Sequence, residues 1–292
     1  MSRIVLSTSS SGLGNIDIKT NIQLIPMRLF VNNVEFIDGK NITQDRLVSI
    51  MSDSACSAVH TSPAPAEEID EILTDLYEQG YKEVFITTTS SGLSESYNII
   101  KQVAQRFQDR MYVYVYDTKE LNMCEAILAL EAEHMMEQGE SMSKIARRLD
   151  ELRASHKLLF AIDTLSTLIK NKKLSATAGF FANMFNIKPV LQMTDDGKLI
   201  AINKIRKLER ALDYIVEDFA DSLQRPNTFA YILTMGRTDI DNYLINLIKR
   251  RTGIQNIPLL PVSNISMGNT GPTGVGLCVF EGEMPYAAQL LR

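Results

Sequence analysis

The first half of the chain alternates short apolar runs with amphipathic runs, and this alternation limits the fold more than any other feature. The strand-like runs are residues 3–6, 22–30, 34–36, 83–86 and 111–116, and the helix-like runs are residues 44–51, 67–79, 97–107 and 124–138. Strand–helix–strand units place their strands in parallel, with ligands bound beyond the carboxyl ends of the strands. The pattern therefore predicts an α/β fold with a mostly parallel sheet.

The second half continues the α/β pattern in a different order. Its predicted strands are residues 158–162, 186–193, 199–205, 229–234, 257–262 and 275–280, and its predicted helices are residues 209–223 and 239–251. A charged helix over residues 143–154 joins the halves, and the turn at 195–197 predicts a hairpin. Because 292 residues exceed the usual size of one domain, we expect two α/β domains, residues 1–155 and 156–292.

A hydroxyl-rich turn follows the strand at 83–86. Residues 87–94 carry six serine and threonine hydroxyls in eight positions, just before a helix-like run. A strand-to-helix turn directs backbone N–H groups and the positive end of the helix dipole at one point, which favours a carboxylate or phosphate. Similar polar turns occur at residues 7–12 and 60–65. Simple helix capping is the structural alternative, although a cap needs a single hydroxyl.

Composition excludes several classes of function. The net charge of −5 and the lack of long basic runs argue against a nucleic-acid partner. No apolar run approaches the length of a membrane span, and no signal sequence precedes the strand at 3–6. Cys56, Cys124 and Cys278 are widely separated and form no CxxC motif, which is typical of a reducing compartment. We expect a cytoplasmic protein without a membrane span.

Known motifs for cofactors and catalysis are missing. The sequence has neither the P-loop nor the complete dinucleotide fingerprint. His60, His134 and His156 are far apart and none has a cysteine or carboxylate at ligand spacing, which predicts no metal site. Ser91 precedes a glycine after a strand but lacks a G-x-S-x-G elbow, so nucleophilic catalysis is disfavoured. We expect no catalytic residue and no cofactor.

An apolar cluster in the second half has the pliability of a lipid pocket. It consists of Phe180, Phe181, Met184 and Phe185, with Ile187 beside it. Methionine and phenylalanine side chains form adaptable apolar walls. An ordinary helix core is the alternative. Together with the uncharged hydroxyl turns, the cluster favours a long apolar ligand with a small anionic head.

Several segments are distinctive when they are taken in this order: Thr61-Ser62, Thr89 to Ser94 with Tyr97, Asp117-Thr118, Asp163-Thr164-Leu165 with Leu168, Asn186 to Leu191, Asp196-Gly197-Lys198, Lys204 with Arg206, and Thr270-Gly271-Pro272 with Gly274 and Gly276. Together they resemble the DegV family of bacterial fatty-acid-binding proteins. The resemblance spans almost the whole chain. It implies a two-domain α/β protein that holds a fatty acid at the domain interface and hands its carboxylate to a separate fatty acid kinase.

The resemblance also implies roles for particular residues. Thr61 and Ser91 match positions that bind the carboxylate, while Asn269 stands where the family often has histidine, and Asn171-Lys172-Lys173 where it commonly has Gly-Gly-Arg. Thr8-Ser9 replaces a common Asp-Ser. The expected head-group contacts are Thr61, Ser62, Ser90, Ser91, Gly92, Asn269 and Thr270, the further contacts to head group or kinase are Ser9, Ser10, Lys173 and Arg206, and the acyl-tail pocket is Phe180, Phe181, Met184, Phe185 and Ile187.

We therefore expect a non-catalytic lipid-binding protein whose ligand is a long-chain fatty acid. Two alternatives of other classes stay open. One is an enzyme of acyl or phosphoryl transfer or hydrolysis with Ser91 as nucleophile. The other is a binding module for a small polar anion at the same helix terminus.

Overall fold

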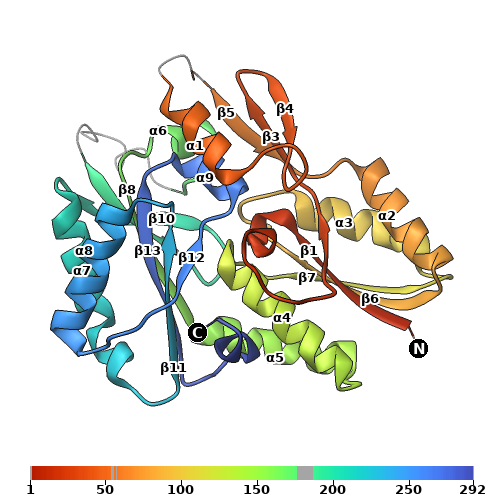
Figure 1. Cartoon of the computed structure of the whole chain (residues 1–292). Helices are drawn as coiled ribbons and strands as arrows, with labels where there is room; N and C mark the ends of the chain where they lie inside the picture. The colour runs from red at the N-terminus through yellow and green to blue at the C-terminus, as the bar shows by residue number, and fades with distance from the viewer. Residues whose placement is uncertain (1, 54–55, 57, 176–186, 292) are drawn as a thin grey trace.

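The first sheet is parallel, as the alternation of strands and helices predicts. The computed structural model describes residues 2–291 except 54–55, 57 and 176–186. The sheet has the order β2-β1-β6-β7, and Figure 1 shows it on the side of the N-terminus. Its strands are β1 (Ser2–Thr8), β2 (Gln23–Ile25), β6 (Tyr81–Thr88) and β7 (Tyr112–Asp117). Their carboxyl ends all face the second half of the molecule.

Helices cover both faces of this sheet. Helices α2 (Ala66–Glu78) and α3 (Ser96–Ala104) bury their apolar stripes against one face, where Ile4 and Leu6 of β1 belong to the same core. Val5, between them, faces α4 (Met123–Glu137) on the other side, and α5 (Met142–Ser155) packs on α4. This alternation follows from the twofold side-chain period of a strand.

A small antiparallel sheet stands beside the first one. It has the order β4-β3-β5, with β3 (Arg28–Val31), β4 (Val34–Ile37) and β5 (Val59–Ser62). The sequence predicts a polar turn over residues 60–65, and for its first residues this is wrong, because Thr61 pairs with Leu29 in the sheet. Helix α1 (Gln44–Ser52) begins at the cap Thr43, whose side chain accepts from the Arg46 N–H.

The second sheet is mixed, with the order β10-β9-β8-β13-β11-β12. Only β11 and β12 pair in parallel among its described strand pairs. The strands are β8 (His156–Ile162), β9 (Lys188–Met193), β10 (Leu199–Ile205), β11 (Thr228–Thr234), β12 (Leu259–Pro261) and β13 (Gly274–Glu281). The predicted hairpin around residues 195–197 is confirmed as β9 and β10.

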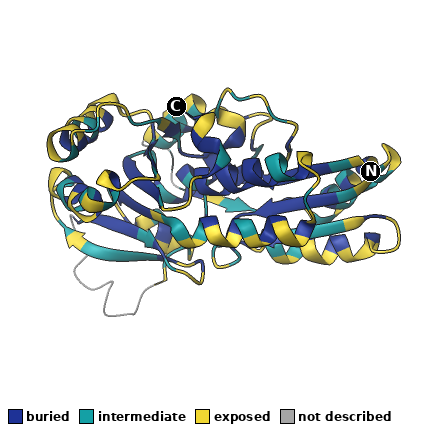
Figure 2. Cartoon of the chain, turned by 90° about the horizontal axis from the view of Figure 1, so that it is seen from below, coloured by how far each residue is buried: buried dark blue, intermediate teal, exposed yellow. Residues whose placement is uncertain are grey.

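Helix α4 lies between the two sheets. Helices α7 (Leu208–Gln224) and α8 (Thr238–Thr252) cover the outer face of the second sheet, whereas α4 shares one continuous core with its inner face. Buried residues therefore occur all around α4, from Met123 to Ala132, and Figure 2 shows the dark buried centre against exposed outer helix faces. A helix that is apolar all round is one enclosed by protein.

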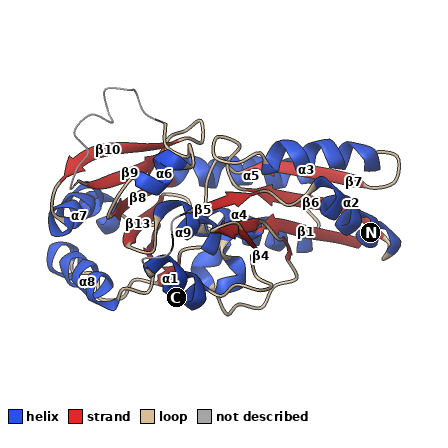
Figure 3. Cartoon of the chain, turned by 90° about the horizontal axis from the view of Figure 1, so that it is seen from above, coloured by secondary structure: helices blue, strands red, loops and turns tan. Residues whose placement is uncertain are grey.

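Two short helices lie where the two halves of the chain, residues 1–155 and 156–292, contact each other, and this contact region is here called the seam. They are α6 (Ser166–Lys170) and α9 (Asn264–Thr270), which contact each other, and α9 also contacts β3 and β5 (Figure 3). Helix α9 begins after Ser263, whose side chain caps it by accepting from the Ser266 N–H. All strands of the first sheet precede His156, and the strands of the second sheet begin with His156 in β8. The predicted domain boundary at 155/156 stays a prediction.

Candidate functional site

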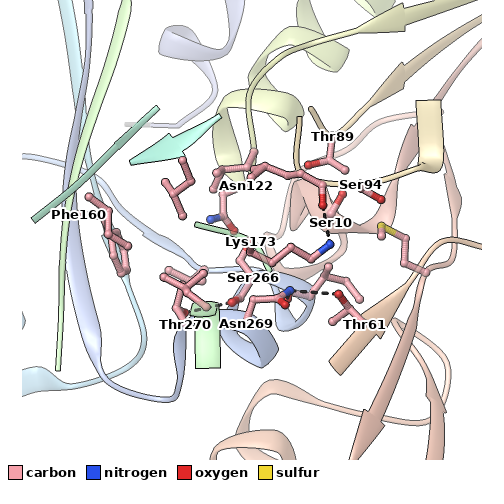
Figure 4. A pocket seen from close by; sticks show the side chains of 18 of the residues that line it. Ser10, Thr61, Thr89, Ser94, Asn122, Phe160, Lys173, Ser266, Asn269 and Thr270 are labelled. Atoms are coloured by element: carbon pink, nitrogen blue, oxygen red, sulfur yellow. Dashed lines mark hydrogen bonds between the residues drawn. The ribbon is translucent and has the colours of Figure 1, made fainter. Parts of the chain in front are cut away.

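A cavity of about 290 Å³ lies at the seam between the first sheet and the second. Most of its polar lining residues belong to the first half of the chain, and most of its apolar lining residues belong to the second half. The polar residues are Ser10, Thr61, Ser62, Thr89, Ser94, Glu95, Asn122, Lys173, Ser266, Asn269 and Thr270, and the apolar ones include Leu158, Phe160, Leu168, Leu191 and Leu199. Figure 4 shows Phe160 at one end and Thr61, Thr89 and Ser94 at the other. The cavity thus has an apolar end and an end lined by hydroxyl groups.

Two consecutive side-chain hydrogen bonds, from Asn171 to Asn269 and from Asn269 to Thr61, hold Thr61 at the polar end of the cavity. The Asn269 side-chain N–H₂ donates to Thr61 Oγ1 at 3.1 Å, and the Asn269 amide oxygen accepts from Asn171 Nδ2 at 3.0 Å (Figure 4). A threonine hydroxyl that accepts one hydrogen bond still has its own proton to donate. Asn269 therefore positions Thr61 as a donor to a ligand in the cavity.

Lys173 brings a cation to the same region. Its Nζ donates to the carbonyl oxygen of Leu93 at 2.5 Å, and the side chain lines the cavity. Burial lowers the pKa of Lys173 from its ordinary value, and the charge of Glu95 opposes that shift. An ammonium group removed from water gains strongly from an anionic partner. The polar end is therefore suited to a carboxylate.

A buried carboxyl group lies behind Ser10. Glu125 of α4 is fully buried and is contacted by the hydroxyls of Ser7, Thr8 and Ser10, with Ser10 Oγ to Glu125 Oε2 at 3.1 Å. Burial raises the pKa of Glu125 to about 8, although the three hydroxyls oppose the shift. At neutral pH the group is mostly protonated. The network therefore orients Ser10 without placing a full negative charge behind the cavity.

In the hydroxyl-rich turn at residues 87–94, the Ser90 and Ser91 hydroxyls bond to other parts of the protein and do not line the cavity. Ser90 Oγ donates to the Gly197 carbonyl at 2.6 Å, and Ser91 Oγ donates to Asp117 Oδ2 at 2.5 Å. Gly92 packs so closely that an added Cβ would lie 2.4 Å from the Gly197 oxygen. The N–H groups of residues 90–94 also have partners within the protein. These N–H groups are therefore engaged within the protein, and Thr89 and Ser94 are the hydroxyls of this turn that line the cavity. Contact of Ser90, Ser91 and Gly92 with a ligand head group stays a prediction.

The remaining predicted residues divide into three groups. Ser10, Thr61, Ser62, Lys173, Asn269 and Thr270 line the cavity, whereas Ser9, Ser90, Ser91, Gly92, Arg206 and Ile187 are not among its lining residues. Ser9 is buried and accepts from the Met27 N–H, and Arg206 is exposed. Ile187 is buried outside the cavity. Phe180, Phe181, Met184 and Phe185 lie outside the described residues.

Sequence reasoning missed the apolar wall of the cavity. Leu158 and Phe160 occupy alternate positions of β8, and Leu191 of β9 pairs in register with Phe160. Strand alternation identifies these residues as one buried face but does not distinguish a core from a cavity wall. A signal was available for Glu125, because it is a charged residue within an otherwise apolar helical run.

Comparison with protein families gives a match over nearly the whole chain. The family model described as "Uncharacterised protein, DegV family" matches residues 4–282. The chain belongs to the DegV family. DegV domain-containing proteins of Clostridium acetobutylicum and Staphylococcus aureus are 24% and 25% identical, over 96% of this chain in both cases and over 100% and 99% of the relatives.

Solved DegV structures have the same fold. A fatty acid binding DegV family protein from Streptococcus agalactiae aligns with a TM-score of 0.86 at 19% identity, covering 97% of this chain and 100% of that one. DegV, a fatty acid binding protein from Bacillus subtilis, aligns with a TM-score of 0.82 at 18% identity, covering 96% and 99%. None of the helices in the described part of the chain has the length and apolar character to cross a bilayer.

Proposed function

We propose that this DegV protein binds a long-chain fatty acid in the cavity at the seam. The observation that carries the proposal is the position of Lys173, a half-buried cation that donates to a backbone carbonyl and lines the polar end of a cavity whose other end is apolar. Thr61 and Ser94 lie at the same end and would donate to the carboxylate. The fatty-acid ligands named for the solved DegV structures support this reading.

The acyl tail would lie along the apolar end, against residues such as Leu158, Phe160 and Leu191. Burial of each methylene contributes about 0.8 kcal/mol before the entropic costs of binding. A tail of about 16 carbons therefore supplies most of the affinity, on the order of 10 kcal/mol. The hydroxyls and Lys173 would set the direction in which the ligand enters.

The protein would act by binding and not by catalysis. Ser91, the alternative nucleophile, donates its hydroxyl proton to a carboxylate, Asp117, and does not line the cavity. A small polar anion would leave the Phe160 end of the cavity without a partner. Presentation of the bound carboxylate to a fatty acid kinase, in the cytoplasm, is part of the same proposal and rests on the family resemblance.

Narrowing the apolar end tests the proposal through chain length. We expect Leu199→Phe to weaken binding of palmitate by roughly tenfold, because overpacking a fitted apolar site costs about 1–3 kcal/mol, and to spare octanoate. Leu199 lines the cavity, whereas Ile200 on the opposite face of β10 does not. Ile200→Phe is therefore the matched control. Equal losses for both acids, measured by calorimetry, would contradict a tail bound at this wall.

A further inference from the structure

A cluster of metal-ligand side chains lies at the seam, apart from the cavity lining. Glu120 precedes α4, Cys124 is on its first turn, and His156 begins β8. One ligand atom from each lies within 4.8 Å of the other two. The sequence has no cysteine or carboxylate at ligand spacing from His156, because the three residues meet only when the halves of the chain pack together.

The orientation of His156 is that of a metal-binding imidazole. Its Nδ1 lies 3.0 Å from Glu120 Oε1, and its Nε2 lies 3.2 Å from the hydroxyl of the fully buried Tyr231. Histidines that bind metals with one ring nitrogen usually donate from the other to a fixed partner. Tyr231 would hold the ring with Nδ1 toward the cluster.

Glu120 carries an unsatisfied atom at this point. The residue is 6% exposed, and its Oε2 is buried without a hydrogen-bond partner among the residues that the structure describes. A buried carboxylate oxygen without a partner is costly, and such atoms in native proteins often indicate a bound ion. The His156 side chain is fully buried and Cys124 is 1% exposed. The three side chains are therefore buried from solvent, and Glu120 Oε2 is available to bind an ion.

We propose that Glu120, Cys124 and His156 bind a zinc ion at the seam between the two halves. A thiolate, an imidazole and a carboxylate form the mixed sulfur, nitrogen and oxygen set that Zn²⁺ accepts in tetrahedral sites. Glu120 Oε2 or a water completes the coordination. On binding, the Cys124 S–H bond breaks, the sulfur bonds to zinc, and the proton leaves to solvent. No redox partner is required.

The ion would join the two walls of the cavity. Leu121 and Leu158, each within two residues of a proposed ligand, both line the cavity. Zinc would therefore stabilise the packing of the halves rather than take part in ligand chemistry.

Metal binding by the full chain tests the proposal. Protein stripped with a chelator under reducing conditions is titrated with Zn²⁺ in a calorimeter, and retained metal is counted by mass spectrometry after desalting. We expect stoichiometric zinc in the wild type and in Cys56→Ala, which removes a half-buried thiol outside the cluster. Cys124→Ala should weaken binding by more than about 100-fold, since even outer partners of metal ligands contribute 10- to 100-fold.

Absorption of bound cobalt reports on the site in the wild type itself, whether or not a variant folds. Co²⁺ added to the wild type should produce a thiolate-to-cobalt charge-transfer band, and Cys124→Ala or His156→Gln should remove it or weaken it. Absence of the band and of retained zinc in the wild type would overturn the proposal. Retention of zinc by a folded Cys124→Ala variant, or its loss from Cys56→Ala, would overturn it as well.

Discussion

Replacing Lys173 with methionine is expected to weaken fatty acid binding by roughly 10- to 100-fold. A hydrogen bond to a charged group contributes about 1.5–3 kcal/mol, and methionine keeps the apolar stem of lysine while removing its charge. Lys173 and Ser94 both line the cavity. The ammonium group lies 2.5 Å from the Leu93 carbonyl oxygen, which is uncharged and therefore compensates its charge less than a carboxylate would. Dissociation constants from calorimetry with palmitate measure the effect.

Two controls isolate the charge of Lys173. Lys172 is the next residue and is exposed outside the cavity lining, so Lys172→Met removes one positive charge without touching the ligand and should leave affinity unchanged. The methyl ester of the fatty acid has no negative charge and should bind the wild type and Lys173→Met about equally. An equal loss for acid and ester would show that Lys173 acts through packing, which contradicts its proposed role.

The second large effect concerns stability. We expect Glu125→Gln to stabilise the protein increasingly as pH rises from about 5 to about 8. Burial raises the pKa of Glu125 from its ordinary value to about 8 in the folded protein, so the unfolded chain loses this proton first and the wild type loses stability with rising pH. The slope is about 1.4 kcal/mol per pH unit, giving a difference of up to a few kcal/mol near pH 8. Below about pH 4.5 both states are protonated and the difference vanishes.

Urea unfolding at several pH values measures this difference in the presence of a chelator, which removes any metal. Glu137 is exposed near the other end of α4, so Glu137→Gln makes the same substitution on this helix at a carboxyl group that is not buried. The control should follow the pH profile of the wild type. If Glu125→Gln also followed it, Glu125 would not be held protonated by burial, and the orientation of Ser10 would need another cause.

The sequence predicts the elements of this fold well because their signals are local. The apolar run at 83–86 and the amphipathic run at 67–79 become β6 and α2, and Gly253 ends α8 with the left-handed backbone expected of a helix terminus. Thr61 is different, since its strand exists only because Leu29 pairs with it. Local composition around Pro63 indicates a turn, and tertiary pairing overrides it for the residues before the proline.

The candidate site is less predictable because it forms where distant segments meet. Ser90 and Ser91 look equivalent to Thr89 and Ser94 in sequence, but Ser90 donates to Gly197 of the β9–β10 hairpin and Ser91 donates to Asp117 at the end of β7. The sequence predicts Asn269 as a head-group residue, and the structure places it in the cavity lining, where it donates to Thr61. Side-chain direction at a seam is set by both halves together.

Recovery of a bound ligand from untreated protein tests the central claim most directly. The wild type is expressed without added lipid, examined by native mass spectrometry, and then extracted with organic solvent. The account predicts an added mass that corresponds to a long-chain fatty acid, lost on extraction and reduced in Lys173→Met. A ligand-free mass under several growth conditions, or a bound small polar anion in place of an acyl chain, would contradict it.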